Sequence, residues 1–197
     1  MLGAVTVSQE TLDPIINAMG QKYGVEPALI KAHIKQESNW DVNASRYENK
    51  LKDSSWGLMQ VLLTTAKSIL NNPNLAITEL IQPAVNIEAG TAYIAQNLSR
   101  FGNMRDAIAA YNAGSPRLNK DGKYINQSYV DKVTNNYNLY KSMGAGPATE
   151  VAIDTTNAAI EVTDAASNIF SGDNGPYYIV AGLGLVGLVL YMSRGEV

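Results

Sequence analysis

The 197-residue sequence contains no cysteine and a single histidine, His33. The absence of thiols excludes a disulfide framework and a thiolate metal site, and one imidazole excludes a multi-histidine metal centre. The sequence also lacks a Gly-rich phosphate loop and any basic run dense enough to indicate nucleic-acid binding. We therefore expect a protein with no metal, no cofactor and no nucleic-acid partner.

Charge is unevenly distributed along the chain. Residues 1–142 carry 14 Lys/Arg against 12 Asp/Glu, whereas residues 143–197 carry one Arg against six acids. The weak positive balance of the first part permits an acidic substrate without indicating one. Residues 143–148 contain two glycines and a proline, so we place a domain boundary there.

Residues 1–142 are predicted to form a mainly helical domain. Apolar residues recur at helical spacing in segments 15–23, 27–37, 64–70, 83–101, 104–113 and 129–140. Residues 45–56 show no clear period, so we predict a loop there, near which one short hairpin could form.

Glu37 is the residue of greatest chemical interest. Pro27 marks a helix start, and Ile30, His33 and Glu37 then share one inward-facing stripe. Partial burial and the negative end of the helix macrodipole both favour the neutral carboxylic acid. A raised pKa suits a general acid, because an ordinary glutamate is ionised above about pH 4.3. The alternative is a solvated residue at a helix end, the usual position of a lone glutamate. His33 is interpreted as a residue bordering the core rather than as a catalytic group.

Three short motifs follow one another over about 80 residues, namely Gln36-Glu37-Ser38, Gly57-Leu58-Met59-Gln60 and Ala110-Tyr111-Asn112-Ala113-Gly114. In this order they resemble the soluble-lytic-transglycosylase and goose-type-lysozyme family over about residues 8–141. The resemblance implies a lysozyme-like helical fold and peptidoglycan as the substrate.

The resemblance also assigns roles to individual residues. Glu37 matches the family's catalytic acid, which protonates the glycosidic oxygen and then acts as a base. Met59 and Gln60 would contact sugar, and Tyr111 and Asn112 would lie opposite the acid. The substrate-binding residues implied in this way are Ser38, Gly57, Leu58, Met59, Gln60, Tyr111, Asn112 and Tyr129. The sequence departs from the family pattern at three places, namely the missing proline at Asp41-Val42, the long segment 45–56, and Leu62-Leu63 in place of Met-Pro.

The number of carboxylates at the site decides the expected product. Most glycosidases use two carboxylates, but the family motif demands none besides Glu37. Candidates for a second one are Asp41, Glu48, Asp53 and Glu88. Attack by the C6 hydroxyl of the same muramoyl residue needs no second carboxylate and gives a 1,6-anhydro sugar. The resemblance thus implies a lytic transglycosylase acting on the MurNAc–GlcNAc bond. A muramidase hydrolase of a conjugation or secretion apparatus and a non-catalytic glycan-binding membrane protein are the alternatives.

Residues 177–192 form a run of sixteen residues without charge. As a helix this run spans about 24 Å, close to the thickness of a bilayer core. We predict a transmembrane helix at 176–193 followed by a short tail at 194–197. The linker at 143–175 is expected to contain a stalk helix or to be disordered.

Residues 1–8 show no secretory signal pattern. A cell-wall enzyme without such a signal needs another route to the wall, and a phage particle provides one. We therefore expect a membrane-anchored enzyme in a virion membrane or bacterial envelope. Its expected partners are peptidoglycan, the membrane, and proteins of the virion or of an envelope complex.

Overall fold

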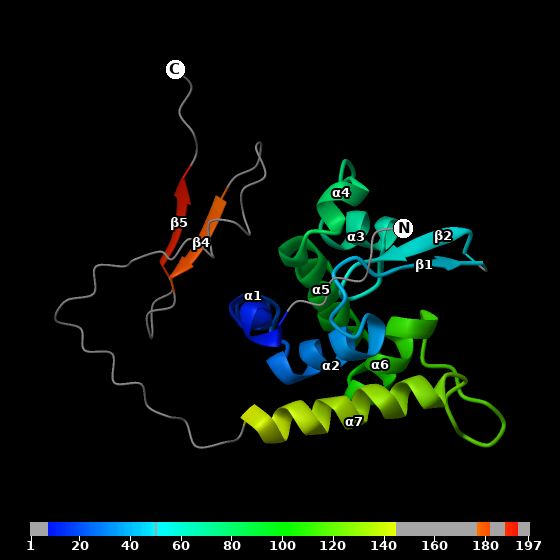
Figure 1. Ribbon diagram of the computed structural model, residues 1–197. Helices are drawn as coiled ribbons and strands as arrows, with labels where there is room; N and C mark the ends of the chain where they lie inside the picture. Colours follow the sequence, from blue (N-terminus) through cyan, green and yellow to red (C-terminus); the bar gives the residue numbers. More distant parts are fainter. Residues whose placement is uncertain (1–7, 50, 145–176, 182–187, 193–197) are drawn as a thin grey trace. The chain divides into compact units, whose positions relative to one another are not determined.

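The computed structural model describes residues 8–49, 51–144, 177–181 and 188–192 (Figure 1). The chain divides into two compact units, residues 1–147 and 148–197. Within the described residues all helices lie in the first unit, so the prediction of a mainly helical domain is confirmed.

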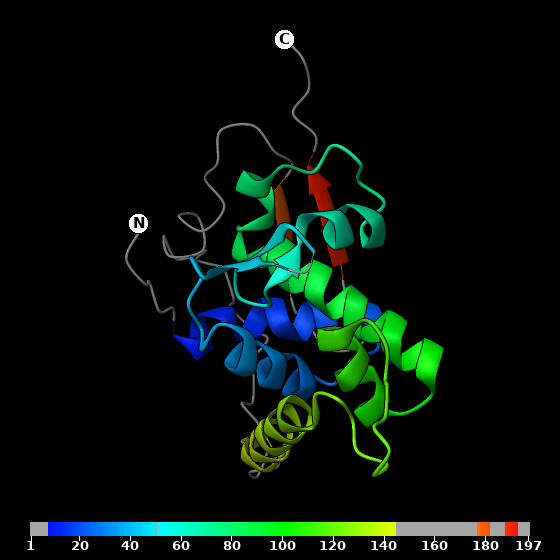
Figure 2. The same ribbon diagram turned by 90° about the vertical axis from the view of Figure 1, so that its right-hand side faces the viewer.

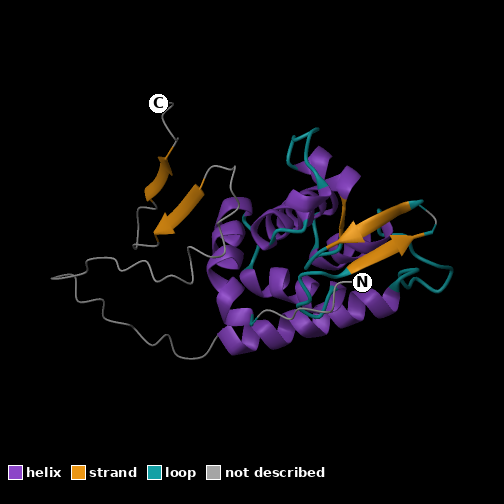
Figure 3. Ribbon diagram, turned by 45° about the horizontal axis from the view of Figure 1, so that its top comes forward, coloured by secondary structure: helices purple, strands orange, loops and turns teal. Residues whose placement is uncertain are grey.

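The first unit combines helices with one small sheet. The helices are α1 (Gln9–Tyr23), α2 (Pro27–Glu37), α3 (Leu63–Ile69), α4 (Ile77–Leu80), α5 (Pro83–Phe101), α6 (Met104–Ala113) and α7 (Gln127–Gly144). The strands β1 (Ser45–Glu48), β2 (Asp53–Trp56) and β3 (Val61–Leu62) pair antiparallel in the order β1-β2-β3. Figure 3 shows β1 and β2 as a hairpin beside the helices.

The helices begin and end at residues with recognisable capping chemistry. The Ser8 side chain caps α1 by accepting from the Thr11 backbone N–H, and Pro27 occupies the first turn of α2. Gly102 ends α5 in the left-handed conformation. Helix α5 packs against α1, α2, α3, α4 and α6, while α2 packs along α7, which Figure 2 shows nearly end-on beneath it. The core therefore forms around α5, and α7 closes the domain.

The segment 45–56 is a hairpin and not the loop predicted from the sequence. Ser45 pairs with Trp56 and Glu48 pairs with Asp53. In β1 and β2 only Ser55 is buried, so neither strand carries the alternation of apolar and polar residues that marks a half-buried strand. The pairing is therefore set by the backbone and by polar contacts, which a hydrophobic pattern does not reveal.

The prediction of a transmembrane helix at 176–193 is wrong for the residues described there. Strands β4 (Tyr177–Ala181) and β5 (Leu188–Met192) pair antiparallel, with Tyr177 opposite Met192. A continuous apolar run has no period to distinguish a helix from a strand, and β-branched and aromatic residues favour strands. Among the described residues, no helix is both long and apolar enough to cross a bilayer. The linker and stalk predicted at 143–175 lie outside the described residues, except that α7 continues to Gly144.

A buried asparagine of α5 ties the hairpin segment to the central helix. The Asn86 amide donates to the carbonyl oxygens of Trp56, at 2.8 Å, and Leu80, at 3.0 Å. Its Oδ1 accepts from the Met59 backbone N–H at 2.8 Å. Gly57 lies between these contacts with φ of 74°, and a Cβ at this position would lie 2.5 Å from Asn86 Nδ2. The close approach of backbone and amide therefore requires glycine.

We expect Gly57→Ala to destabilise the domain more than Gly102→Ala does. Both glycines have φ of 74°, but a Cβ at Gly102 would meet no atom within 4 Å. The control thus carries only the conformational cost of about 1–2 kcal/mol, whereas Gly57→Ala adds an overpacking cost of about 1–3 kcal/mol. Urea denaturation of the two variants measures the difference. Equal losses of unfolding free energy would show that Asn86 moves aside freely.

Candidate functional site

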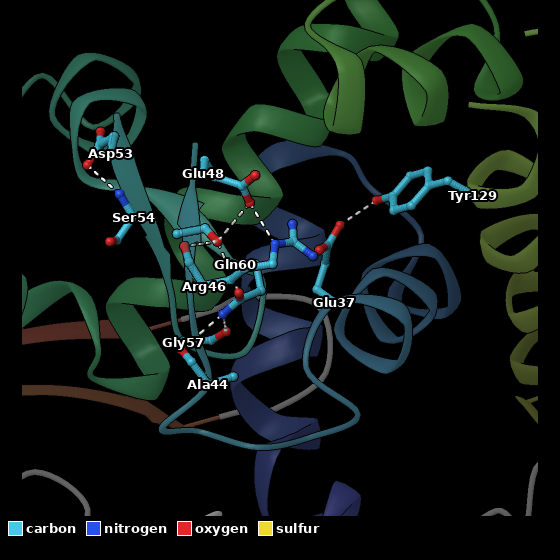
Figure 4. A network of polar contacts seen from close by, with 10 residues as sticks. Glu37, Ala44, Arg46, Glu48, Asp53, Ser54, Gly57, Gln60 and Tyr129 are labelled. Atoms are coloured by element: carbon cyan, nitrogen blue, oxygen red, sulfur yellow. Dashed lines mark hydrogen bonds and ion pairs between the residues drawn. The ribbon is translucent and has the colours of Figure 1, made fainter. Parts of the chain in front are cut away.

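Glu37 ends α2, and its carboxylate is held by a tyrosine from the last helix of the domain. Tyr129 Oη, on α7, donates a hydrogen bond to Glu37 Oε1 at 2.6 Å (Figure 4). The Glu37 side chain is only partly exposed. Desolvation raises the pKa of Glu37 to about 7, against the opposing effect of the Tyr129 hydrogen bond. At neutral pH this carboxyl group is therefore present in both its protonated and its ionised forms.

A charged pair from the hairpin adds to the electrostatics of Glu37. Arg46 Nε lies 2.7 Å from Glu48 Oε1, and Figure 4 shows Arg46 extending from β1 toward Glu37. The Arg46 charge lowers the pKa of Glu37 and the Glu48 charge raises it. Because these two charges have opposite signs, their effects on Glu37 oppose each other, and burial remains the main cause of the raised pKa.

Aromatic residues enclose the other side of the site. His33 lies one turn before Glu37 in α2 and is 1% exposed. Its ring centroid lies 4.5 Å from that of Tyr111, which in turn lies 5.1 Å from that of Tyr93. Tyr111 Oη donates to the Met59 carbonyl oxygen at 2.9 Å. Helices α2, α5 and α6 and the segment after β2 therefore meet in this cluster.

The Gly-Leu-Met-Gln block, residues 57–60, is mostly buried beneath the site. Leu58 and Met59 are 1% and 0% exposed, so their side chains have no surface with which to contact a sugar. The Gln60 amide donates to the carbonyl oxygens of Ala44, at 2.9 Å, and Gly57, at 3.0 Å. Its Oε1 accepts from Ser55 Oγ at 3.0 Å. These contacts fix the base of the hairpin, so the block positions β1 and its charges.

Two other predicted residues are likewise engaged in local hydrogen bonds. Ser38 Oγ donates to the Ile34 carbonyl oxygen at 3.2 Å, at the end of α2. Asn112 Oδ1 accepts from Asn126 Nδ2 at 3.0 Å, which links α6 to the start of α7. Of the predicted residues, Tyr129 is the one hydrogen-bonded to the Glu37 carboxylate.

Sequence reasoning assigned no role at the site to Arg46, Asn86 or Tyr93. Arg46 and Glu48 are two residues apart, a spacing that places both on one face of a strand, so recognition of the hairpin would have revealed the pair. Among the four candidates for a second carboxylate, Glu48 is the one that acts on the Glu37 charge. Glu88 instead pairs with Lys22.

Residues 14–133 match the family described as the transglycosylase SLT domain. The chain belongs to this family. The resemblance drawn from the three motifs is thus confirmed for the SLT domain.

Proteins similar to this SLT-domain chain come from a phage and from bacteria. The "Transglycosylase" of Enterobacteria phage PRD1 is 32% identical over 124 residues, covering 63% of this chain and 42% of the relative. The "Membrane-bound lytic murein transglycosylase C" of Actinobacillus pleuropneumoniae serotype 5b is 30% identical over 146 residues, covering 66% of this chain and 38% of the relative. The chain therefore spans about 40% of the length of these curated relatives.

A solved structure shares the fold of the SLT domain. It is that of an inactive mutant of the lytic transglycosylase Slt from Pseudomonas aeruginosa, in which a glutamine replaces a glutamate. The match has a TM-score of 0.53 and 25% sequence identity, and it covers 67% of this chain and 24% of that one. The described helices of residues 8–144 thus have the arrangement expected of a lysozyme-like domain.

We expect Tyr129→Phe to raise the pKa of Glu37 above about 7, because the phenol hydrogen bond favours the ionised carboxylate. A carbon-13 NMR titration of the carboxyl group measures this pKa directly. Tyr124→Phe is the matched control, since Tyr124 Oη donates to Asp106 Oδ1 at 2.7 Å instead of to Glu37. An unchanged or lower pKa in Tyr129→Phe would contradict the role given to the phenol.

Proposed function

We propose that this chain is a lytic transglycosylase that cleaves the MurNAc–GlcNAc bond of peptidoglycan and leaves a 1,6-anhydro-MurNAc end. The observation that carries this proposal is the Glu37 carboxyl group of an SLT domain, desolvated to a pKa of about 7 and held by Tyr129. Such a group can release a proton and take one back at neutral pH.

The proposed reaction needs one carboxyl group for two proton transfers. Protonated Glu37 donates its proton to the glycosidic oxygen as the bond from that oxygen to C1 of MurNAc breaks. The resulting carboxylate then accepts the proton of the C6 hydroxyl of the same MurNAc residue, and the C6 oxygen bonds to C1. Glu37 ends protonated again, and the Tyr129 hydrogen bond stabilises the carboxylate between the two transfers.

Intramolecular attack is favoured over attack by water for two reasons. The C6 hydroxyl is tethered to the reacting sugar, and well-oriented intramolecular groups reach effective molarities of about 10⁵–10⁸ M. Glu48, the carboxylate best placed to act as a second base, is paired with Arg46 at 2.7 Å. This ion pair engages Glu48 Oε1 with Arg46, so that oxygen is not free to orient an attacking water.

The functional residues carried over from the family remain part of this proposal. Glu37 is the catalytic residue, and Gln60, Tyr111 and Asn112 are proposed to line the substrate side of the site. The burial of Leu58 and Met59 gives them a supporting role. The glutamine that replaces a glutamate in the inactive Pseudomonas Slt mutant supports the importance given to the carboxyl group here.

We expect Glu37→Gln to lose activity by a factor of about 10²–10⁴ while the domain stays folded, because the amide keeps the shape and removes the transferable proton. Mass spectrometry of digested peptidoglycan measures both the activity and the product. The wild-type digest should contain 1,6-anhydro-muramoyl ends, lighter by one water than hydrolysed ends. Glu88→Gln is the control, since Glu88 pairs with Lys22 and has no role in the proposed reaction.

Two results would contradict the proposed transglycosylase reaction. A Glu37→Gln enzyme with more than about a tenth of the wild-type activity would exclude Glu37 as the acid. Reducible muramic acid ends, lost in Glu48→Gln, would instead establish a hydrolase with Glu48 as the base. The interaction of Glu48 with Glu37 makes this muramidase the second candidate function.

We further propose that residues 1–142 are the catalytic domain of a phage or envelope protein, and that the segment 177–192 contacts a membrane. The support is the phage PRD1 relative, the relative named membrane-bound, and the sixteen uncharged residues of the segment. The linker proposed at 143–175 and the tail at 194–197 carry no catalytic candidate. Local opening of the wall during phage entry is the role that fits this organisation.

We expect the full chain to sediment with lipid vesicles and a chain ending at Gly144 to remain in the supernatant with full activity on isolated glycan. The truncation leaves intact the contact of α7 with α2 at Tyr137, whose Oη donates to Glu26 Oε2 at 3.0 Å. A full-length Val180→Asp/Val189→Asp variant is the control, because these paired residues place charge within the apolar run. Equal sedimentation of all three proteins with the vesicles would contradict the proposed membrane contact.

A further inference from the structure

The proposed reaction leaves one buried titratable group without a role, namely His33. It is the only histidine of the chain and is 1% exposed. Its Nδ1 lies 3.2 Å from Tyr129 Oη, and the same Oη lies 2.6 Å from Glu37 Oε1. The phenol oxygen of Tyr129 is therefore a bridge between the carboxyl group and the imidazole.

A phenol carries one proton, so Tyr129 can donate to only one of these neighbours at a time. When Glu37 is ionised, Tyr129 donates to the carboxylate, and its oxygen can accept from His33 only if Nδ1 carries the imidazole proton. When Glu37 is protonated on Oε1, that oxygen donates to the phenol oxygen, and Tyr129 can donate to His33 only if Nδ1 is bare. With that proton on Oε1, both hydrogen bonds persist in both states only if the imidazole changes tautomer.

We propose that His33 is a positioning residue whose neutral imidazole changes tautomer with the protonation state of Glu37, acting through Tyr129. The proton is on Nδ1 when Glu37 is ionised and on Nε2 when Glu37 is protonated. The role of this change rests on the proposed function, in which Glu37 serves first as acid and then as base. A partner fixed as donor or as acceptor would favour one of those states over the other.

The surroundings keep the imidazole and the phenol uncharged. Burial lowers the pKa of His33 to about 3, so the ring is neutral wherever Glu37 titrates. Burial and the nearby Glu37 charge hold the pKa of Tyr129 well above its ordinary value. One proton therefore leaves the three side chains when Glu37 ionises: they share three ionisable protons before and two afterwards.

Other titratable groups near the three side chains do not offer a competing route. Tyr111, from α6, directs its hydroxyl proton to the Met59 carbonyl oxygen at 2.9 Å. Tyr93, from α5, reaches the cluster through ring contact with Tyr111. Arg46 and Glu48, from β1, bond to each other on the far side of Glu37 from Tyr129 (Figure 4). The contact of His33 with Glu37 therefore runs through the Tyr129 hydroxyl.

Nitrogen-15 NMR of histidine-labelled full-length protein tests the proposal, because a single imidazole gives one pair of ring nitrogen signals. Between about pH 5 and pH 9, around the raised pKa of Glu37, Nδ1 should change from an unprotonated to a protonated nitrogen as the pH rises. Nε2 should change in the opposite sense, with the midpoint of the Glu37 carboxyl titration followed by carbon-13 NMR. Tyr129→Phe and Glu37→Gln should each give a tautomer that does not depend on pH.

Three outcomes would overturn the proposal: an imidazole with the same tautomer throughout, formation of imidazolium in this range, or a tautomer change that persists in Tyr129→Phe. The wild-type titration is decisive even if a variant fails to fold. Because the measurement uses no substrate, it is independent of the peptidoglycan assay. If the peptidoglycan assay shows no transglycosylase product but the tautomer change is observed, the inference about His33 still holds. If the tautomer does not change but the assay gives the expected product, the proposed activity still holds.

Discussion

The hydrogen bond from Tyr129 to Glu37 is the contact on which the site depends, and it requires α2 and α7 to pack side by side. A second bond of the same kind lies at the other end of this helix pair, where Tyr137 donates to Glu26 at 3.0 Å. Glu26 precedes α2 and Glu37 ends it, while Tyr137 follows Tyr129 by two turns of α7, so the helices run antiparallel. Two phenol–carboxylate bonds thus fix the register of α7 on α2.

These two bonds lead to opposite electrostatic results. The carboxylate of Glu26 is exposed and also lies 2.9 Å from Lys141, which holds its pKa below the ordinary value. Glu37 makes the same bond to a tyrosine, but desolvation outweighs that bond and raises its pKa to about 7. The difference arises from solvent and a nearby cation, because the bond to tyrosine is common to both sites. The same type of contact thus forms a structural clamp at one end of the helix pair and, at the other, holds the carboxyl group proposed to transfer protons.

The sequence allowed prediction of the parts of the fold that follow local rules. The helix expected at 83–101 is α5, and the stripe through Ile30 and His33 correctly predicts the burial around Glu37. A short hairpin near the predicted loop was left open, but its position at 45–56 escaped prediction because its strands are mostly exposed. The apolar C-terminal run was misread because it has no period. Met59 was expected to contact sugar, whereas its carbonyl oxygen accepts from Tyr111 and its side chain is in the core. A motif identifies which residues matter, but burial decides whether a side chain contacts the ligand or supports its neighbours.

The raised pKa of Glu37 also carries a cost in stability, and the sign follows from proton binding. The folded chain holds the Glu37 proton up to about pH 7, whereas an unfolded chain releases it near pH 4.5. The folded state therefore loses stability as the pH rises between these values, by no more than about 3 kcal/mol, since the side chain is partly exposed. A glutamate selected for stability alone would gain a cation, as Glu26 does with Lys141. At Glu37 the nearby cation, Arg46, is instead paired with Glu48, and burial raises the pKa of the carboxyl group. In the proposed reaction this leaves a proton on Glu37 in the pH range where a glycosidic oxygen needs one.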